Sequence, residues 1–282
     1  MATSNSFDMT RAWEEAVALL SANRQTVLVV AGVFFFLPYL AVVLLVPELG
    51  SIMGGQSETT DPDAALAAMQ ATMAKNWWVL LLWSLIQMAG SLGLLALLAK
   101  SGRPTLGSAL QDGFAGLLPY LAAYIAVALG LSLAVGLLVA LFSLTGSQAL
   151  AAIPILLALP VMIYVFVKVS LVAPVIGVEG GRNPVAAIRR SWSLTRGNSF
   201  RLFLFYALLM VAYLVLSLVI TLVLGLVFAL FGESLALIAD AILGSAISAV
   251  ATTVSLAVLA AAHRQLSGHA TRASVPRVTK AD

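Results

Sequence analysis

The chain has 282 residues, of which 61% are hydrophobic and only 10% are charged, with a formal net charge of +3. Soluble domains contain about 25% charged residues, so this composition predicts a protein that lies in a lipid bilayer and has no soluble domain of ordinary size. The absence of cysteine excludes disulfides, thiol catalysis and thiolate metal sites. Basic residues form no long run with interleaved aromatics, which argues against nucleic-acid binding.

Six apolar runs are long enough to cross a membrane, since a spanning helix needs about 20 apolar residues. They cover residues 26–46, 77–99, 117–142, 150–178, 200–231 and 234–262. We therefore predict an all-α integral membrane protein with one six-span domain over residues 1–266. The polar tail, residues 267–282, is predicted to be disordered. We expect no cleavable signal peptide, because the first 25 residues contain three acidic groups and no short apolar core.

The longest predicted connection is residues 47–76, between the first two spans. Its part from 50 to 63 is polar and rich in glycine, and we expect it to be flexible. Residues 64–75 have the composition of a short surface helix. His263 and His269 fall in the predicted polar tail, so we expect no metal site and no cofactor.

Charge sets the predicted orientation. Most Lys and Arg residues lie before span 1, after span 2, between spans 4 and 5, and after span 6, all on one side of a six-span topology. The other side has Lys75 alone among several acidic residues. The positive-inside rule then places both termini in the cytoplasm. We predict a multi-pass protein of the bacterial cytoplasmic (inner) membrane.

Three short amphipathic helices are predicted before spans 1, 3 and 5, with Asp8, Thr105 and Asn183 as their N-caps. The segments RAWEEAVALLSAN, SALQDGFAGLLPY and AAIRRSWSLTRGN align without gaps. Helices of this kind lie in the headgroup plane with their apolar face down.

The chain can thus be divided into three repeats, each an interfacial helix followed by a helical hairpin. Their boundaries are residues 7–100, 104–180 and 183–266. Internal symmetry of this kind is common in transporter-like folds. The alternative is that any helix leading into a membrane converges on the same pattern.

One motif follows the fourth span: a basic residue, an apolar run with Pro, a Glu, an Arg-Arg-Ser-Trp segment and Leu-Thr-Arg-Gly. Its residues are Lys168, Pro174, Glu179, Ala187, Ile188, Arg189, Arg190, Ser191, Trp192, Leu194, Thr195, Arg196 and Gly197. This motif resembles that of the glycerophosphoryl diester phosphodiesterase membrane-domain family. The resemblance implies a six-span bacterial membrane protein.

In some members of that family the membrane domain is joined to a soluble phosphodiesterase domain with a His-Arg-Gly and Glu-x-Asp pattern. This chain has neither pattern, so the resemblance carries no catalytic residue over to it.

The arginine-rich helix between spans 4 and 5 is the first candidate site. Arg189 and Arg196 are seven residues apart and are expected to share a face, with Trp192 between them and Arg190 beside them. Guanidinium groups suit phosphate, and a basic pocket near the inner leaflet could bind anionic headgroups. The alternative is that the arginines only set the topology while Trp192 anchors the interface.

Besides Arg201 at the mouth of span 5, two charged residues fall inside predicted spans. Lys168 lies about 15 Å along the helix from the end of span 4, and Asp240 about 10 Å into span 6 from the outer side. Charges at such depth are candidates for function. The alternatives are a lysine that snorkels to the headgroups and a hydrated aspartate near the outer surface. A direct bridge between the two is not expected, because they lie in opposite halves of the bilayer.

These features favour a non-catalytic membrane protein, not an enzyme, that interacts with anionic lipids or organises protein partners at the membrane. A transporter of a lipid or small solute that uses Lys168 and Asp240 is the second hypothesis. A membrane-embedded enzyme is the third, although too few titratable groups lie together to support it. A continuous polar cavity reaching Lys168 and Asp240 would favour transport.

Overall fold

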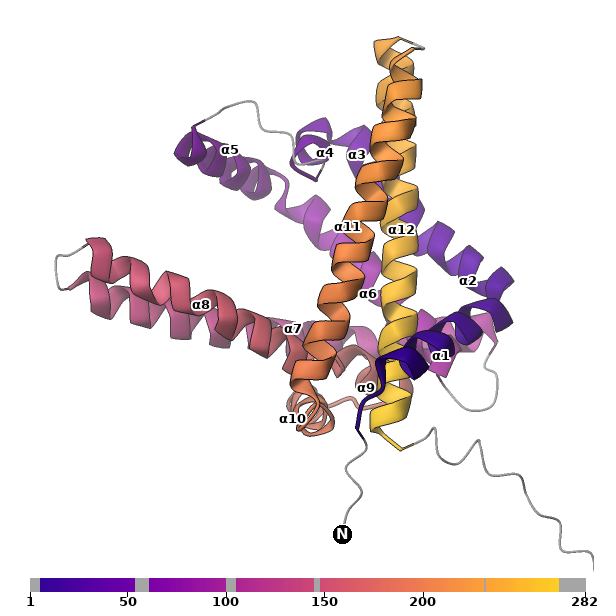
Figure 1. Cartoon of the computed structure of the whole chain (residues 1–282), viewed down its shortest axis with the longest axis vertical. Helices are drawn as coiled ribbons and strands as arrows, with labels where there is room; N and C mark the ends of the chain where they lie inside the picture. The colour runs from indigo at the N-terminus through magenta and orange to yellow at the C-terminus, as the bar shows by residue number, and fades with distance from the viewer. Residues whose placement is uncertain (1–5, 54–60, 100–104, 145–147, 231, 269–282) are drawn as a thin grey trace, which may run out of the picture.

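The computed structural model describes residues 6–53, 61–99, 105–144, 148–230 and 232–268. These residues form helices and contain no β-strand (Figure 1). Six helical segments within them are long and apolar enough to cross a membrane: Arg24–Leu45, Trp77–Ala99, Leu106–Ser143, Leu156–Glu179, Ser199–Phe228 and Leu235–Leu266. The chain is an all-α, multi-pass membrane protein, as predicted. Part of the loop predicted to be flexible and nearly all of the predicted disordered tail lie outside the described residues.

The first span contains a π-helical stretch. It consists of α2 (Arg24–Val30), η1 (Ala31–Phe36) and α3 (Leu37–Leu45), which follow one another without a break. Pro38 has no backbone N–H and cannot bond the carbonyl of Phe34 in the α-helical pattern. A π turn just before the proline accommodates this missing bond within a continuous helix.

The loop after the first span holds two short helices, α4 (Pro47–Met53) and α5 (Pro62–Lys75). The helix predicted at the end of this loop is confirmed as α5, and the side chain of Asp61 caps it. Lys75 Nζ lies 2.8 Å from Glu48 Oε1, so an exposed ion pair joins the two helices.

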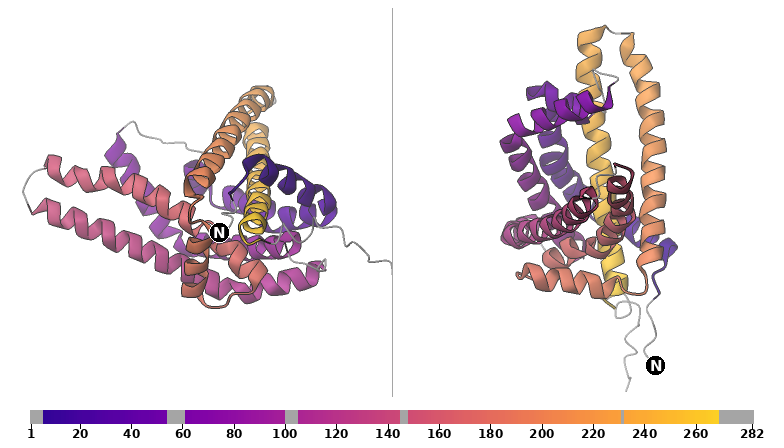
Figure 2. Two further views of the ribbon diagram at one scale, coloured as in Figure 1. Left: turned by 60° about the horizontal axis from the view of Figure 1, so that its bottom comes forward. Right: turned by 90° about the vertical axis from the view of Figure 1, so that its left-hand side faces the viewer.

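The rest of the chain forms α6, two long hairpins, α7–α8 and α11–α12, and the short helices α9 and α10. Its helices are α6 (Trp77–Ala99), α7 (Leu106–Ser143), α8 (Gln148–Val169), α9 (Val172–Glu179), α10 (Pro184–Leu194), α11 (Ser199–Ala229) and α12 (Glu233–Leu266). Figure 1 shows that the α7–α8 and α11–α12 hairpins leave the centre of the molecule in different directions, and Figure 2 shows the same from two other sides.

The separate amphipathic helix predicted before span 3 is wrong, because α7 runs through both segments as one helix. Before spans 1 and 5 the chain does break, between α1 (Met9–Ala22) and α2 and between α10 and α11. Asn23 and Asn198 occupy equivalent positions there and share a non-helical backbone, with φ/ψ of −121°/20° and −117°/4°. Tyr120 stands at this position in the second predicted repeat and lies inside regular α7.

Span 4 is divided into α8 and α9. The break lies at Ser170 and Leu171, just before Pro174, whereas Pro160 lies inside regular α8. Pro174 cannot donate to the carbonyl of Ser170, which explains why the helix is interrupted there. Span 4 is therefore interrupted before Pro174 and not at Pro160.

The core lies where three helices end. The C-terminal halves of α6 and α12 and the whole of α9 pack against one another and bury residues on nearly every side. Their fully or almost fully buried apolar residues include Leu92, Leu94, Leu95, Val172, Ala173, Ile176, Ala257, Val258, Ala260 and Ala261. By contrast, the most apolar stretches of α7 and α11 bury none of their residues, so lipid must cover them.

The three aligned amphipathic segments have the same local structure. The side chains of Asp8, Thr105 and Asn183 each accept a hydrogen bond from a backbone N–H in the first turn of their helix. Each helix buries a pair of small residues four apart. The pairs are Ala12 with Ala16, Ala109 with Gly113, and Ala187 with Ser191.

The three helices also expose equivalent large apolar residues. Val17, Phe114 and Trp192 have relative exposures of 46%, 60% and 40%. The small face of each helix therefore points to protein, and the large apolar residue beside it is free to meet lipid. This is the arrangement expected for interfacial helices.

Each of these helices packs on the last helix of the preceding predicted repeat. The start of α7 packs on α6 and α10 packs on α9, while α1 packs on α12 at the far end of the chain. The contact between α1 and α12 makes the order cyclic. Three interfacial segments thus surround a core made from the ends of three spans.

Candidate functional site

A buried hydroxyl group of α10 joins this helix to the end of α8. Asn183 caps the helix and Pro184 occupies its first turn, so the sequence begins it sharply. Ser191 is fully buried, and its Oγ donates to the backbone carbonyl of Lys168 over 2.6 Å. This carbonyl lies at the end of α8, next to the break before α9. Helix α10 is therefore fixed directly over the kink of span 4.

A carboxylate links α9, α10 and α12. Glu179 Oε1 lies 2.9 Å from His263 Nε2 and accepts from Nε and Nη2 of Arg190 at 3.3 Å. His263 is 1% exposed, which corrects its placement in the polar tail. The alanines before it continue the helical pattern, and α12 extends to Leu266. The alanines before His263 are the sequence signal that indicates that the helix continues past this residue.

Beside this link lies a cavity of about 480 Å³. It is formed by α10, the turn to α11, the first turn of α11, the end of α12 and the segment before α1. The residues that line it are Ser6, Arg190, Ser193, Leu194, Arg196, Gly197, Asn198, Arg201 and Leu266. Three guanidinium groups and no carboxylate line this space, which we call the arginine cavity.

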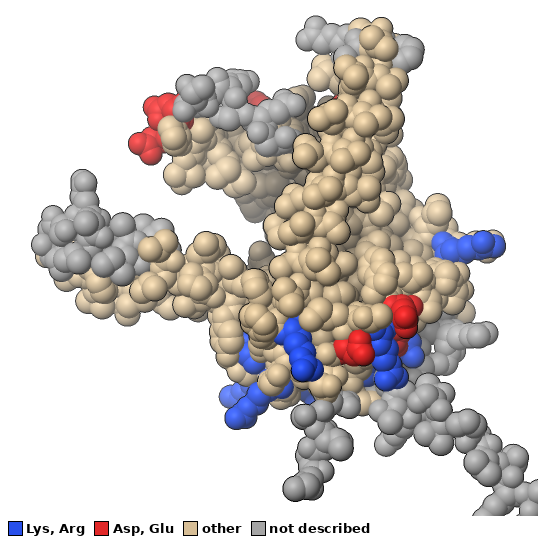
Figure 3. All heavy atoms as spheres, in the orientation of Figure 1, with Lys and Arg blue, Asp and Glu red and all other residues tan. Residues whose placement is uncertain are grey.

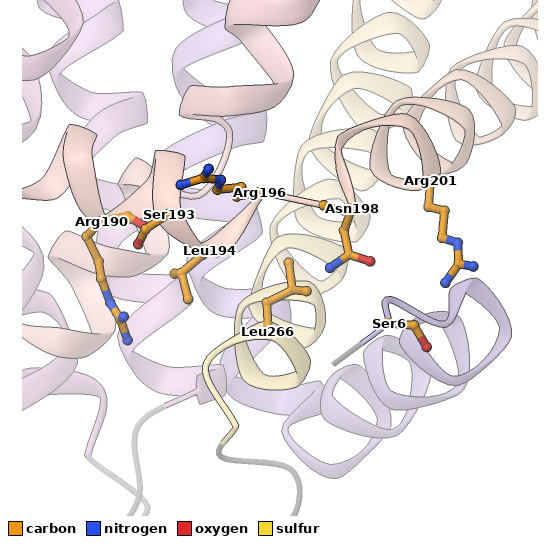
Figure 4. A pocket seen from close by; sticks show the side chains of 9 residues that line it. Ser6, Arg190, Ser193, Leu194, Arg196, Asn198, Arg201 and Leu266 are labelled. Carbon is orange, nitrogen blue, oxygen red and sulfur yellow. The ribbon is translucent and has the colours of Figure 1, made fainter. Parts of the chain in front are cut away.

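The polar groups of the arginine cavity lie on two sides. Arg190 and Ser193 of α10 are on one side, and Arg201 of α11 is on the other beside Ser6 (Figure 4). Arg196 lies toward the side of Arg190, and Leu266 and Asn198 lie between the two sides in this view. The cavity is therefore basic at both ends and carries no charged side chain in the middle.

The segment before α1 closes one wall of the cavity. The backbone N–H of Phe7 donates to Asn198 Oδ1 at 2.9 Å, and that of Asp8 to Gln265 Oε1 at 3.3 Å. The ring of Phe7 packs on that of Phe205, with centroids 5.6 Å apart. These contacts bring the start of the chain to the arginine-rich segment nearly two hundred residues away.

Positive charge gathers at this end of the molecule. Figure 3 shows Lys and Arg side chains around α10 and the end of α12, and an acidic group far away on α5. Arg264 pairs with Glu15 at 2.9 Å, and Arg190 pairs with Glu179. Among the described residues, no carboxylate forms an ion pair with Arg196 or Arg201. The positive charges of these two guanidinium groups are therefore available to a ligand.

Two of the four residues predicted for headgroup contact line the cavity, namely Arg190 and Arg196. Arg189 is exposed and does not line it. The expected common face of Arg189 and Arg196 is wrong, because α10 ends at Leu194 and Arg196 lies in the following turn. Arg201 was missed as a site residue, although it lies only five positions after Arg196.

Trp192, the fourth predicted residue, contacts Lys168 instead. Lys168 is 4% exposed, and its Nζ lies 5.5 Å from the ring centroids of both Trp192 and Tyr164. The two rings meet edge to face with centroids 5.8 Å apart. The ammonium is thus held between two aromatic rings, a favourable cation–π arrangement, and it ties α8 to α10.

Asp240 lies far from this site along α12 and is exposed. A second, smaller cavity of about 70 Å³ lies near Asp112, Gly177 and Arg182. Neither Lys168 nor Asp240 lines either of these two cavities. The structure does not bring the two intramembrane charges together.

Within the described part of the chain, no group of three or more His, Asp or Glu side chains is placed to hold a metal ion.

Comparisons with protein-family models, curated proteins and solved structures found no match for this chain. The interpretation of the site therefore depends on its own geometry and charge.

Proposed function

We propose that this chain is a non-catalytic membrane protein that binds the phosphate of anionic lipid headgroups in the arginine cavity. The observation that carries this proposal is the convergence of Arg190, Arg196 and Arg201 on one cavity without a lining carboxylate. Guanidinium groups present N–H forks that match phosphate oxygens. Basic pockets between membrane helices are typical sites for anionic headgroups.

The surroundings of the cavity favour a lipid over a free phosphate ion. Phe200 and Leu204 flank Arg201 on α11 and are 74% and 47% exposed. A headgroup held by Arg201 would leave its acyl chains beside this apolar surface. A free phosphate ion has no apolar part and would gain no favourable contact with this apolar surface.

The charge pattern supports a cytoplasmic location for the arginine cavity, under the positive-inside rule. In this orientation the cavity faces the leaflet of the bacterial inner membrane that carries anionic lipid on the cytoplasmic side. The motif from Lys168 to Gly197 would then be, as in the family it resembles, the cytoplasmic link between spans 4 and 5. Transport is not favoured, because neither described cavity is lined by Lys168 or Asp240.

The test compares two triple variants with equal loss of charge. One replaces Arg190, Arg196 and Arg201 with Gln. The other replaces Arg11, Arg24 and Arg189, which are exposed and lie outside the arginine cavity. Thermal unfolding of the purified protein in detergent is followed with added phosphatidylglycerol, phosphatidylcholine or inorganic phosphate.

We expect phosphatidylglycerol to stabilise the wild type and the control by about 2–3 kcal/mol near saturation, as ligand linkage requires. The cavity variant should lose most of this effect, and phosphatidylcholine should have little effect on any of the three. Equal stabilisation of both variants would overturn the proposal. Stabilisation by inorganic phosphate to the same extent would show that the ligand is a free anion.

A further inference from the structure

We infer that the arginine cavity selects a headgroup with two phosphates joined by a short bridge, the cardiolipin class, over a headgroup with one. This inference rests on the proposed function and narrows its ligand. It depends on where the cationic groups lie and on how many charges they leave unpaired.

The two sides of the cavity are each equipped for one phosphate. Arg190 and Arg196 offer guanidinium groups on one side, and Arg201 does so with the hydroxyl of Ser6 beside it on the other (Figure 4). A single phosphate is too small to reach both sides of a space of about 480 Å³. This volume lies within the range of about 300–1,000 Å³ that is typical of sites for whole small molecules.

The uncharged middle fits the bridge between two phosphates. Leu266 and Asn198 lie between the two basic sides in Figure 4, and neither carries a charge. A short glycerol link has no charge of its own and can cross this middle part. A third phosphate would find no cation there.

The number of unpaired positive charges in the cavity favours the same class of ligand. Arg190, Arg196 and Arg201 contribute three positive charges, and Glu179 cancels one of them through its contact with Arg190. Among the described residues Arg196 and Arg201 form no ion pair with a carboxylate, so two unpaired guanidinium charges remain. Each phosphodiester carries one negative charge, so two of them balance the cavity and one does not.

The experiment uses the full chain in lipid nanodiscs of phosphatidylcholine doped with either anionic lipid. Cardiolipin is added at half the molar fraction of phosphatidylglycerol, so that both present the same number of phosphates. Native mass spectrometry then counts the lipids that remain bound. The wild type should retain cardiolipin about tenfold more strongly per phosphate, since one further charge-assisted contact is worth about a factor of ten or more.

Single variants separate the two sides. Arg201→Gln should abolish the preference for cardiolipin while keeping part of the binding of phosphatidylglycerol through Arg190. Among the described residues Arg201 has no carboxylate partner, so the change should leave unfolding in plain detergent unaltered. Arg189→Gln, outside the cavity, should retain the full preference.

Equal retention of the two lipids per phosphate by the wild type would overturn this inference. It would leave the proposed function intact if retention still depended on the cavity arginines. If retention is the same in Arg201→Gln, Arg190→Gln and the wild type, the proposed function fails together with this inference.

Discussion

Gly113 marks a close approach between two helices. A Cβ atom at this position would lie 2.8 Å from the carbonyl oxygen of Ala89 and from the backbone nitrogen of Gly93. A methyl group there forces α6 and α7 apart. We expect Gly113→Ala to lower the free energy of unfolding by about 1–3 kcal/mol, as overpacking does elsewhere.

Gly130 provides the matched control, because it lies on the same helix with nothing within 4 Å of its Cβ position. Gly130→Ala should leave stability unchanged or raise it by up to about 1 kcal/mol through helix propensity. Equilibrium unfolding in mixed micelles measures both. Equal effects of the two substitutions would contradict the close approach.

The aromatic contacts of Lys168 are a second feature of single residues. A desolvated cation–π contact is worth about 2 kcal/mol, so we expect Lys168→Met and Trp192→Leu to be coupled. A double-mutant cycle on the free energy of unfolding should give a coupling of about 1–2 kcal/mol. Additive effects would mean that the ring and the ammonium do not stabilise each other.

The sequence predicted part of the site residue by residue. Arg190 and Arg196 were found because basic residues after an apolar span are conspicuous. Ser6 was not, because only the tertiary contacts of Phe7 with Asn198 and of Asp8 with Gln265 bring it to the cavity. Glu179 was noticed only as part of a motif, and no pattern in the sequence pairs it with His263.

At the level of whole helices, the hydrogen bond of Ser191 positions α10 against span 4. Ser191→Ala removes the bond to the buried carbonyl of Lys168 and should cost about 1–3 kcal/mol, since the carbonyl is left unsatisfied. Hydrogen exchange of the α10 amides should become faster.

Ser193→Ala is the control for this prediction. Ser193 is exposed and its Oγ bonds only the carbonyl of Arg190 within the same helix. Its removal should change stability by less than about 0.5 kcal/mol. If both variants exchange alike, Ser191 does not fasten α10 to the kink.

The short helices α4 and α5 are joined by a contact that depends on pH. The ammonium of Lys75 holds the pKa of the Glu48 carboxyl below its ordinary value of 4.5. A carboxyl with a lowered pKa stabilises the folded state above its ordinary pKa, and this contribution is lost as the pH falls through the lowered value.

Lys75→Gln should therefore raise the pKa of Glu48 towards 4.5, which the carboxyl carbon shift in NMR reports. Any difference in thermal stability between this variant and the wild type should be small, because the pair is exposed, and should vanish in acid. A difference that grows on acidification would contradict the assignment.

Helix existence was easier to predict than helix ends. Apolar length gave all six spans, and side-chain caps gave the starts of α1, α7 and α10. The fusion in α7 was missed because the aligned segments suggested three separate helices, although Tyr120 stands where the other two segments have asparagine. The break in span 4 lies just before Pro174, whereas Pro160 lies inside regular α8.

For the whole molecule, charge separation along the long axis predicts orientation in the membrane. The chain has no cysteine, so single cysteines can report it cleanly. Ala186→Cys in α10 and Ala67→Cys in α5 replace exposed residues. In intact cells an impermeant maleimide should label Ala67→Cys only, and Ala186→Cys should react after the membrane is opened. The reverse pattern would place the arginine cavity outside the cell.

The cyclic order of packing was beyond prediction from the sequence. The alignment of the three amphipathic segments suggested equivalent helices, and their caps and buried small residues support this. It did not indicate that the first of them would pack on α12. That contact pairs surfaces from opposite ends of the chain, and no local pattern specifies it.

The contact between α1 and α12 affects the order in which the helices can pack during synthesis. Helix α1 is synthesised before α12, yet its face with Ala12 and Ala16 packs on α12. Until α12 is inserted, this face lacks its main packing partner, and Asp8 lacks its contact with Gln265. A chain stopped short of α12 would therefore present an unpartnered leading segment, by which proteolysis could distinguish incomplete copies from finished ones.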